Sequence, residues 1–256
     1  MQALIDGDLI VYRVGFTTEG DPSEIASFRV NDVIDNILRD TKADSYKVYL
    51  TQEDDLEAFR RKVYPEYKAT RLGKPKPKWY HYIRDYLQVE WGAEVVKYIE
   101  ADDALGIEQI KGLRQFDPDP SYWNQPEFNK NTIICSVDKD LKQIPGYHYN
   151  FVKQEKEFVE TTDALRYFYK QLLTGDSADN IKGVYKVGPV KAEQILSGLT
   201  SEQELFSRVR ETYGNDSEML LNGRVLWIWR KSQDDWIHRF KDLAQCSDED
   251  LENLKL

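Results

Sequence analysis

Residues 95–103 read Val-Val-Lys-Tyr-Ile-Glu-Ala-Asp-Asp, a short apolar run that ends in three acids within four residues. Pairs of acids also follow other predicted elements: Asp6 and Asp8 after 2–5, Asp138 and Asp140 after 132–137, and Asp176 and Asp179 after a helical run. A single Asp in such a place is often only a helix N-cap. Because a cap needs one acid per helix, the repeated clusters indicate a shared site rather than capping.

The carboxyl ends of parallel strands form one rim of an α/β sheet, where ligands bind. Carboxylates crowded on that rim raise each other's pKa unless cations neutralise them. Mg²⁺ takes such oxygen ligands, and two ions roughly 3.5–4 Å apart commonly serve the cleavage of phosphodiesters. The acids therefore predict a site for divalent metal ions.

Apolar runs and helical periodicities alternate along the first part of the chain. Strands are predicted at 2–5, 46–50, 95–99, 133–137 and 147–152, and helices at 30–38, 56–63, 79–91 and 102–113. This alternation predicts an α/β fold with a mainly parallel central sheet flanked by helices. Residues 116–131 hold three prolines without a clear period and are predicted to form a loop or insertion.

The pattern becomes helical near residue 160, with helices predicted at 161–173, 189–197, 201–213 and 217–231. We therefore expect an α/β body at 1–160 and a helical C-terminal part at 161–256.

The net charge of −10 over 256 residues argues at first against a nucleic-acid binder. The charge is uneven, however, because residues 68–78 contain five basic residues and no acid. This run is a candidate phosphate-binding segment, and a solvated charge run is the alternative. No apolar run could span a bilayer, the N-terminus lacks a signal pattern, and there are only two cysteines. We expect a reducing, cytoplasmic compartment and no membrane.

Residues 175–192 combine glycines with lysines around a turn. Gly183 and Gly188 bound the turn, and Pro189 is a favoured first residue of the helix after it. Backbone N–H groups exposed in such a turn can hold a phosphate. The segment is typical of a helix–hairpin–helix that binds a duplex backbone, with an ordinary glycine turn as the alternative.

Together these motifs resemble the flap endonuclease/5′→3′ exonuclease family, most closely its phage-type enzymes. The stretches that carry the resemblance lie in the order of the family, at 4–8, 65–71, 100–103, 136–145 and 175–192. The resemblance implies a PIN-like 5′-nuclease fold and a metal-dependent enzyme that cleaves DNA from 5′ ends or at 5′ flaps. A gateway, or arch, is expected near 60–80, and a helix–three-turn–helix at 183–188.

The resemblance also implies site residues. The metal-site carboxylates would be Asp6, Glu100, Asp102, Asp103, Asp138, Asp140, Asp176 and Asp179, holding two Mg²⁺ or Mn²⁺ ions. The catalytic residues would be Lys68, Arg71, Asp102 and Asp138, with the two basic residues stabilising the phosphoryl charge. The DNA contacts would be Tyr67, Lys74, Lys76, Lys182, Gly183, Lys186, Gly188 and Lys191. Tyr67 is expected either to stack on a terminal base or to pack in the core.

A potassium ion at the turn and RNA–DNA hybrids as further substrates are also expected, as are a monomeric state and contact with replication proteins. The role would be primer removal or phage DNA replication in the host cytoplasm.

Three departures from the family pattern stand out. The usual Asp after the second strand is missing, and Glu53, Asp54 or Asp55 is expected to replace it. Lys186 stands where the turn has its middle glycine, which predicts either a strained left-handed residue or an added phosphate contact. The short, proline-containing gateway predicts no long ordered arch without DNA.

Two other functions are compatible with the strand-end acids. A PIN-type ribonuclease shares them but generally lacks the turn at 183–188. A non-catalytic structural DNA binder is supported by the missing second-strand Asp alone. The three histidines, dispersed along the chain, have no metal-ligand spacing, and nothing supports a Ser-His-Asp arrangement.

Overall fold

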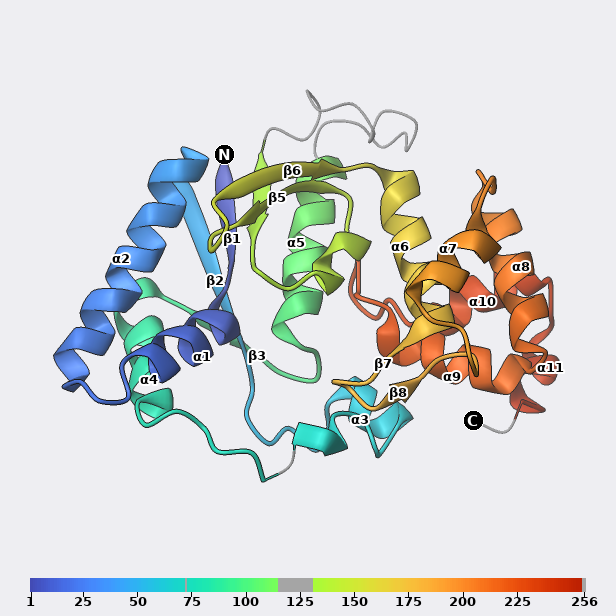
Figure 1. Cartoon of the computed structure of the whole chain (residues 1–256), viewed down its shortest axis with the longest axis horizontal. Helices are drawn as coiled ribbons and strands as arrows, with labels where there is room; N and C mark the ends of the chain where they lie inside the picture. Colours follow the sequence, from blue (N-terminus) through green and yellow to red (C-terminus); the bar gives the residue numbers. More distant parts are fainter. Residues whose placement is uncertain (72, 115–130, 255–256) are drawn as a thin grey trace.

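The computed structural model describes residues 1–71, 73–114 and 131–254 (Figure 1). The predicted insertion at 116–131 lies, except for residue 131, outside the described residues. Among those residues, no helix is long and apolar enough to cross a membrane.

The described residues form one six-stranded sheet in the order β3-β2-β1-β4-β5-β6. The strands are β1 Gln2–Asp6, β2 Ser45–Thr51, β3 Glu94–Val96, β4 Thr132–Cys135, β5 Gly146–Asn150 and β6 Glu155–Val159. The first five pair in parallel, and β6 runs antiparallel to β5. The prediction of a mainly parallel central sheet is confirmed.

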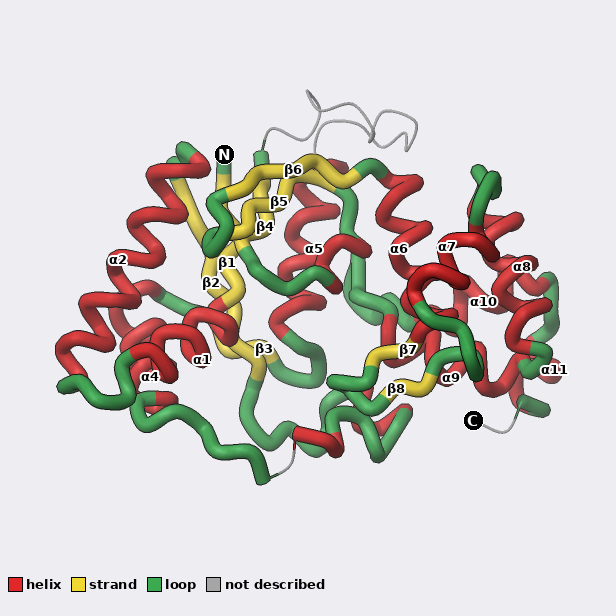
Figure 2. The backbone as a smooth tube through the Cα atoms, viewed as in Figure 1, coloured by secondary structure: helices red, strands yellow, loops and turns green. Residues whose placement is uncertain are grey.

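β1 lies in the middle of the sheet because both of its faces are apolar. Ala3 and Ile5 pack on one face, against α1 Gly7–Thr17, α2 Ser23–Thr41 and α4 Tyr80–Trp91. Leu4 points to the other face, which α5 Ala101–Arg114 covers. Helices thus lie on both faces of the strands (Figure 2).

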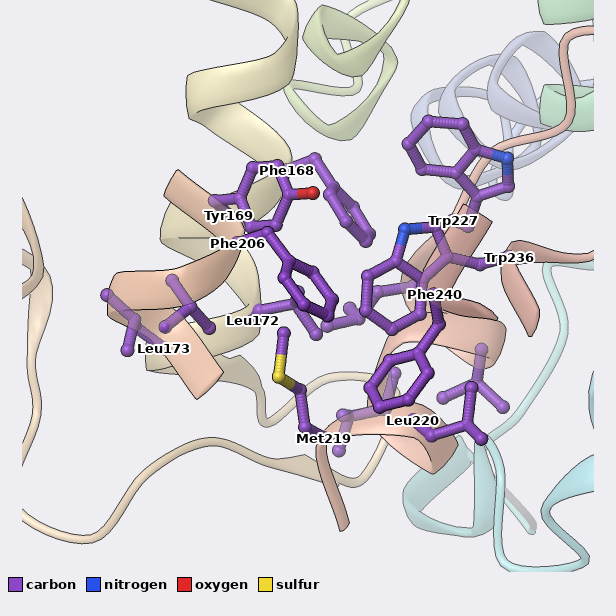
Figure 3. Packing of buried hydrophobic residues seen from close by; sticks show 14 of the residues in the cluster. Phe168, Tyr169, Leu172, Leu173, Phe206, Met219, Leu220, Trp227, Trp236 and Phe240 are labelled. Carbon is purple, nitrogen blue, oxygen red and sulfur yellow. The ribbon is translucent and has the colours of Figure 1, made fainter. Parts of the chain in front are cut away.

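The C-terminal part is helical, as predicted. It comprises α6 Thr161–Thr174, α7 Pro189–Leu196, α8 Glu202–Tyr213, α9 Asp216–Leu226, α10 Trp236–Ala244 and α11 Asp248–Glu252. Its core is aromatic (Figure 3). The Phe168 and Trp227 rings meet edge to face with their centroids 4.8 Å apart, and the Trp236 and Phe240 ring centroids are 5.6 Å apart. Such edge contacts suit the ring quadrupoles.

Two small segments are also part of the fold. The gateway segment contains α3 Phe59–Val63 and a 3₁₀ turn, Ala69–Arg71. A short hairpin, β7 Gly175–Asp176 with β8 Ile181–Lys182, follows α6 and lies beside α3 in Figure 1. The hairpin needs glycine at both ends, because a Cβ on Gly183 would come within 2.3 Å of the Gly175 nitrogen.

Candidate active site

A cleft of about 440 Å³ opens at the carboxyl ends of β1 and β2, between the gateway and the β7–β8 hairpin. Seven of the eight predicted metal ligands are among the described residues that line it: Asp6, Glu100, Asp102, Asp138, Asp140, Asp176 and Asp179. They come from β1, from α5 and the residue before it, from the segment after β4, and from the hairpin. The chain thus brings together acids that are up to about 170 positions apart in the sequence.

Asp6 is the last residue of β1 and is 2% exposed. One carboxylate oxygen accepts from Ser136 Oγ at 2.8 Å, and the other accepts from the Leu9 N–H at 3.2 Å, so Asp6 also caps α1. Burial, and then the charge of Asp8, raise the pKa of Asp6 to about 7. A carboxyl held in this way favours a nearby cation.

Asp8 is oriented by Arg84, which the sequence analysis did not single out. Arg84 Nη1 donates to Asp8 Oδ1 at 3.0 Å, and the Thr51 N–H donates to Oδ2 at 3.0 Å. Arg84 is 5% exposed and lies on the buried face of α4 with Tyr80 and Leu87. In the sequence, the signal for this role of Arg84 is a charged residue at a position that falls on the apolar face of the helix.

Glu100 is held by cations of the gateway. It forms an ion pair with Lys68, and Arg60 Nη1 lies 3.6 Å from Oε2. Burial alone would raise the pKa of Glu100, but the charges of Lys68 and Arg60 lower it to about 2. Arg71 pairs with Asp179 in the same way. The two predicted gateway cations therefore lie at the acidic cleft.

Tyr67 is buried, with 6% of its surface exposed. Its hydroxyl oxygen lies 2.9 Å from Glu100 Oε2 and 3.1 Å from Asp179 Oδ2, so its one proton can be donated to either carboxylate. The ring packs in the C-terminal core. A buried ring has no free face for a base, so the structure supports the packing alternative and not base stacking.

The remaining acids fall into two groups whose members repel one another, and Asp138 belongs to both groups. Burial, and then Asp6 and Asp138, raise the pKa of Asp102 well above its usual range. Burial, and then Asp138 and Asp176, raise the pKa of Asp140 to about 7. Two overlapping clusters of carboxylates are what two neighbouring cations would neutralise.

As the side chains stand, no three Asp, Glu, His or Cys residues in the described part of the chain are close enough together to hold a metal ion. The acids are instead turned toward protein cations: Glu100 to Lys68, Asp179 to Arg71, and Asp8 to Arg84. The donor set, which is all carboxylate and mostly half-buried, nevertheless fits a hard divalent ion.

Asp103 does not fit its predicted role as a metal ligand. It is 0% exposed, lies outside the cleft, and binds Arg60, which is 4% exposed, through both oxygens. The N–H groups of Glu100 and Trp229 donate to it as well, each at 3.0 Å. Both oxygens are therefore saturated, and the placement gives Asp103 a structural role.

The candidates for the missing second-strand acid differ in placement. Glu53 and Asp54 line the cleft. Glu53 forms an ion pair with Lys76, and Arg84 Nε lies 3.9 Å from Glu53 Oε2. Asp55 instead accepts from the N–H groups of Glu57 and Tyr98 and organises its own loop.

The predicted DNA contacts divide into two sets. Lys74 and Lys76 line the cleft, whereas Lys182, Lys186 and Lys191 are exposed outside it. Lys186 has φ of +61°, so the left-handed backbone expected at the middle position of the turn is present. Gly183 is required by the hairpin, while Gly188 caps α7 with open space around its Cα.

The chain resembles 5′ nucleases, and comparisons with known proteins agree with this resemblance. No family model matches the chain. It is 29% identical over 231 residues to the 5′-3′ exonuclease of Buchnera aphidicola subsp. Schizaphis graminum, covering 83% of this chain and 72% of that protein. It is 24% identical over 236 residues to the flap endonuclease Xni of Shewanella baltica strain OS185, covering 87% and 84%.

Solved structures extend the match to nearly the whole fold. The T5 D15 protein crystallised with metal ions aligns with a TM-score of 0.67 at 14% identity, covering 99% of this chain and 96% of that one. A bacteriophage T5 D15 flap endonuclease complex with DNA and metal ions aligns with a TM-score of 0.66 at 13% identity, covering 95% and 98%. The predicted resemblance, the fold class and the assignment as a hydrolytic nuclease are confirmed.

Proposed function

We propose that the protein is a divalent-metal-dependent 5′→3′ exonuclease and 5′-flap endonuclease that hydrolyses DNA phosphodiesters with two metal ions. The observation that carries the proposal is the cleft at the strand ends, where half-buried carboxylates meet gateway cations. The names of the sequence relatives support the same activity.

The two overlapping acid groups divide the metal-binding work. Asp6, Glu100 and Asp102 would serve one ion, Asp140, Asp176 and Asp179 the other, and Asp138 both. Bound Mg²⁺ or Mn²⁺ would supply an activated water and neutralise the leaving oxygen. The T5 relatives crystallised with metal ions, including zinc, support the use of divalent cations.

Protein groups position the acids and the phosphate. Ser136 and the Leu9 N–H fix Asp6, and Arg84 fixes Asp8. Lys68 and Arg71, which now bind carboxylates, would turn to the phosphoryl oxygens once metal ions take over the acids. Arg71 can contact a phosphate through two N–H groups at once.

Duplex DNA would bind at the turn 183–188, where Lys182, Lys186 and Lys191 are exposed. The left-handed Lys186 keeps the backbone shape that glycine would give, which supports a potassium ion there as well. This turn favours a flap nuclease over a PIN-type ribonuclease. RNA–DNA hybrids, replication proteins, a monomeric state, a phage replication role and the host cytoplasm stay predictions.

The test uses a 5′-labelled duplex, a matched DNA flap and a matched RNA flap with Mg²⁺, Mn²⁺ or EDTA. We expect short 5′ products from the DNA substrates, and none with EDTA. The Asp138→Asn variant should bind DNA but not cleave it, because it removes the carboxylate that the two acid groups share. Preference for the RNA flap would favour the ribonuclease, and DNA binding without cleavage under either metal would favour a structural binder.

A further inference from the structure

The base of the gateway, residues 64–71, is hydrogen-bonded to the loop between β7 and β8, residues 177–180. Asn180 supplies two of these bonds. Its Nδ2 donates to the Glu66 carbonyl at 3.0 Å, and its carbonyl accepts from the Tyr64 hydroxyl at 3.2 Å. The two segments are more than 100 positions apart in the sequence, so these bonds join separate parts of the fold.

The gateway supplies two further bonds of the same joint. Thr70 Oγ1 donates to the Ala178 carbonyl at 2.9 Å. The Lys68 N–H donates to the Asp179 carbonyl at 3.0 Å. Backbone and side chains of both segments therefore contribute, and the contact does not rest on the Lys68 and Arg71 ion pairs alone.

The backbone on each side of the joint is left-handed at a residue other than glycine. Lys68 has φ of +58° and Asn180 has φ of +62°. Such conformations persist where surrounding contacts hold them, and Asn tolerates them better than most residues. The hydrogen bonds of the joint are the contacts that hold both residues here.

The joint links two functional parts of the proposed nuclease. On the gateway side it carries Lys68 and Arg71 at the cleft. On the hairpin side, β8 leads directly into the turn 183–188, and Asn222 Nδ2 fixes the Lys182 carbonyl at 2.7 Å. A duplex held at the turn is therefore connected to the two cations through only a few ordered residues.

We infer that Asn180 is a positioning residue which, together with Thr70, ties the gateway base to the β7–β8 loop and so fixes Lys68 and Arg71 relative to the bound duplex. The inference rests on the proposed function, but the joint itself can be tested without metal or DNA.

The first experiment measures local opening by limited trypsin digestion of the metal-free protein. Asn180→Gly permits the left-handed backbone but removes the side-chain bond, and Thr70→Val removes the hydroxyl at similar size. The control is Thr212→Val, because the Thr212 hydroxyl bonds within its own helix, α8, to the Arg208 carbonyl. Since one hydrogen bond changes an opening equilibrium about fivefold, cleavage after Lys68 and Arg71 should be about fivefold faster in both test variants and unchanged in the control.

The second experiment compares kcat and KM on the flapped duplex. A misplaced cation weakens an interaction made in the transition state, so kcat should fall in both test variants while KM stays constant. Thr70→Ser, which keeps the hydroxyl, should restore kcat. Digestion at the wild-type rate in both variants, or a change in KM alone, would overturn the inference. A wild-type protein that cleaves no nucleic acid would refute the proposed function, while the digestion would still decide on the joint.

Discussion

The buried Arg60–Asp103 pair should be a main determinant of stability. Arg60 donates to both Asp103 oxygens and to the carbonyls of Val225 and Trp227. It therefore joins α3 and α5 to the end of α9 and the residue after it. In Arg60→Met, Asp103 would stay buried with only two N–H donors, and both carbonyls would lose a partner. Removing one member of a buried pair costs about 3–5 kcal/mol.

This loss is large enough to measure by urea unfolding followed by tryptophan fluorescence. With a slope of about 2–3 kcal/mol per M, the midpoint should fall by about 1–2.5 M. Lys62→Met is the matched control, because Lys62 lies in the same helix and pairs with Glu57 in solvent; its midpoint should barely move. The double variant Arg60→Met/Asp103→Leu should recover part of the loss. A midpoint for Arg60→Met equal to that of Lys62→Met, or a double variant no more stable than the single one, would refute the reasoning.

Three further predictions concern the cleft and the turn. Burial raises the pKa of Asp6 to about 7, so its contribution to the stability of the metal-free protein should be present below pH 4 and lost as the pH rises to 7. Added Mg²⁺ should therefore raise the melting temperature more at pH 8 than at pH 5, which differential scanning fluorimetry can check; an equal shift would contradict the assignment. Gly183→Ala should destabilise the fold by about 1–3 kcal/mol in chemical denaturation, because its Cβ would meet the Gly175 nitrogen; a neutral effect would count against the tight hairpin. Lys186→Gly should relieve the strain of a left-handed backbone at a residue other than glycine. If the lysine contacts one phosphate, the variant should also reduce the slope of log affinity for duplex DNA against log salt by about 0.9. An unchanged slope in a fluorescence anisotropy titration would exclude that contact.

The sheet and most of the cleft could be predicted because the signals are local. The centre of β1 is apolar on both faces, and Asp6 follows directly, so strand and acid are read from the same few residues. Asp138 is likewise read together with β4, although the strand ends at Cys135, with two residues in between. Parallel pairing then brings the strand ends to one rim, which is a property of the fold and needs no further information.

The role of Asp103 could not be predicted in this way. In the sequence it looks like its neighbour Asp102, but successive side chains on a helix point about 100° apart. Asp102 therefore reaches the cleft, whereas Asp103 turns toward Arg60, more than 40 positions away in the sequence. A long-range partner of this kind leaves no local pattern. The buried positions of Tyr67 and Arg84 likewise depend on tertiary packing.

Element ends were missed for identifiable reasons. The strand predicted at 95–99 ends at Val96, because Tyr98 has φ of +67° and leaves the extended conformation. The helix predicted at 217–231 ends at Leu226, where the Trp227 carbonyl and the Trp229 N–H turn to Arg60 and Asp103. β6 was not predicted, because Glu155-Lys156-Glu157 shows no alternating apolar pattern.

Both margins of the sheet carry features that discourage association with other chains. At one edge, β3 is only three residues long, so it offers few unpaired backbone groups with which a strand of another chain could pair. At the other, β6 exposes Glu155, Lys156 and Glu157 in succession, and an incoming strand would have to bury their charges. A protein guarded in this way should resist β-aggregation when concentrated.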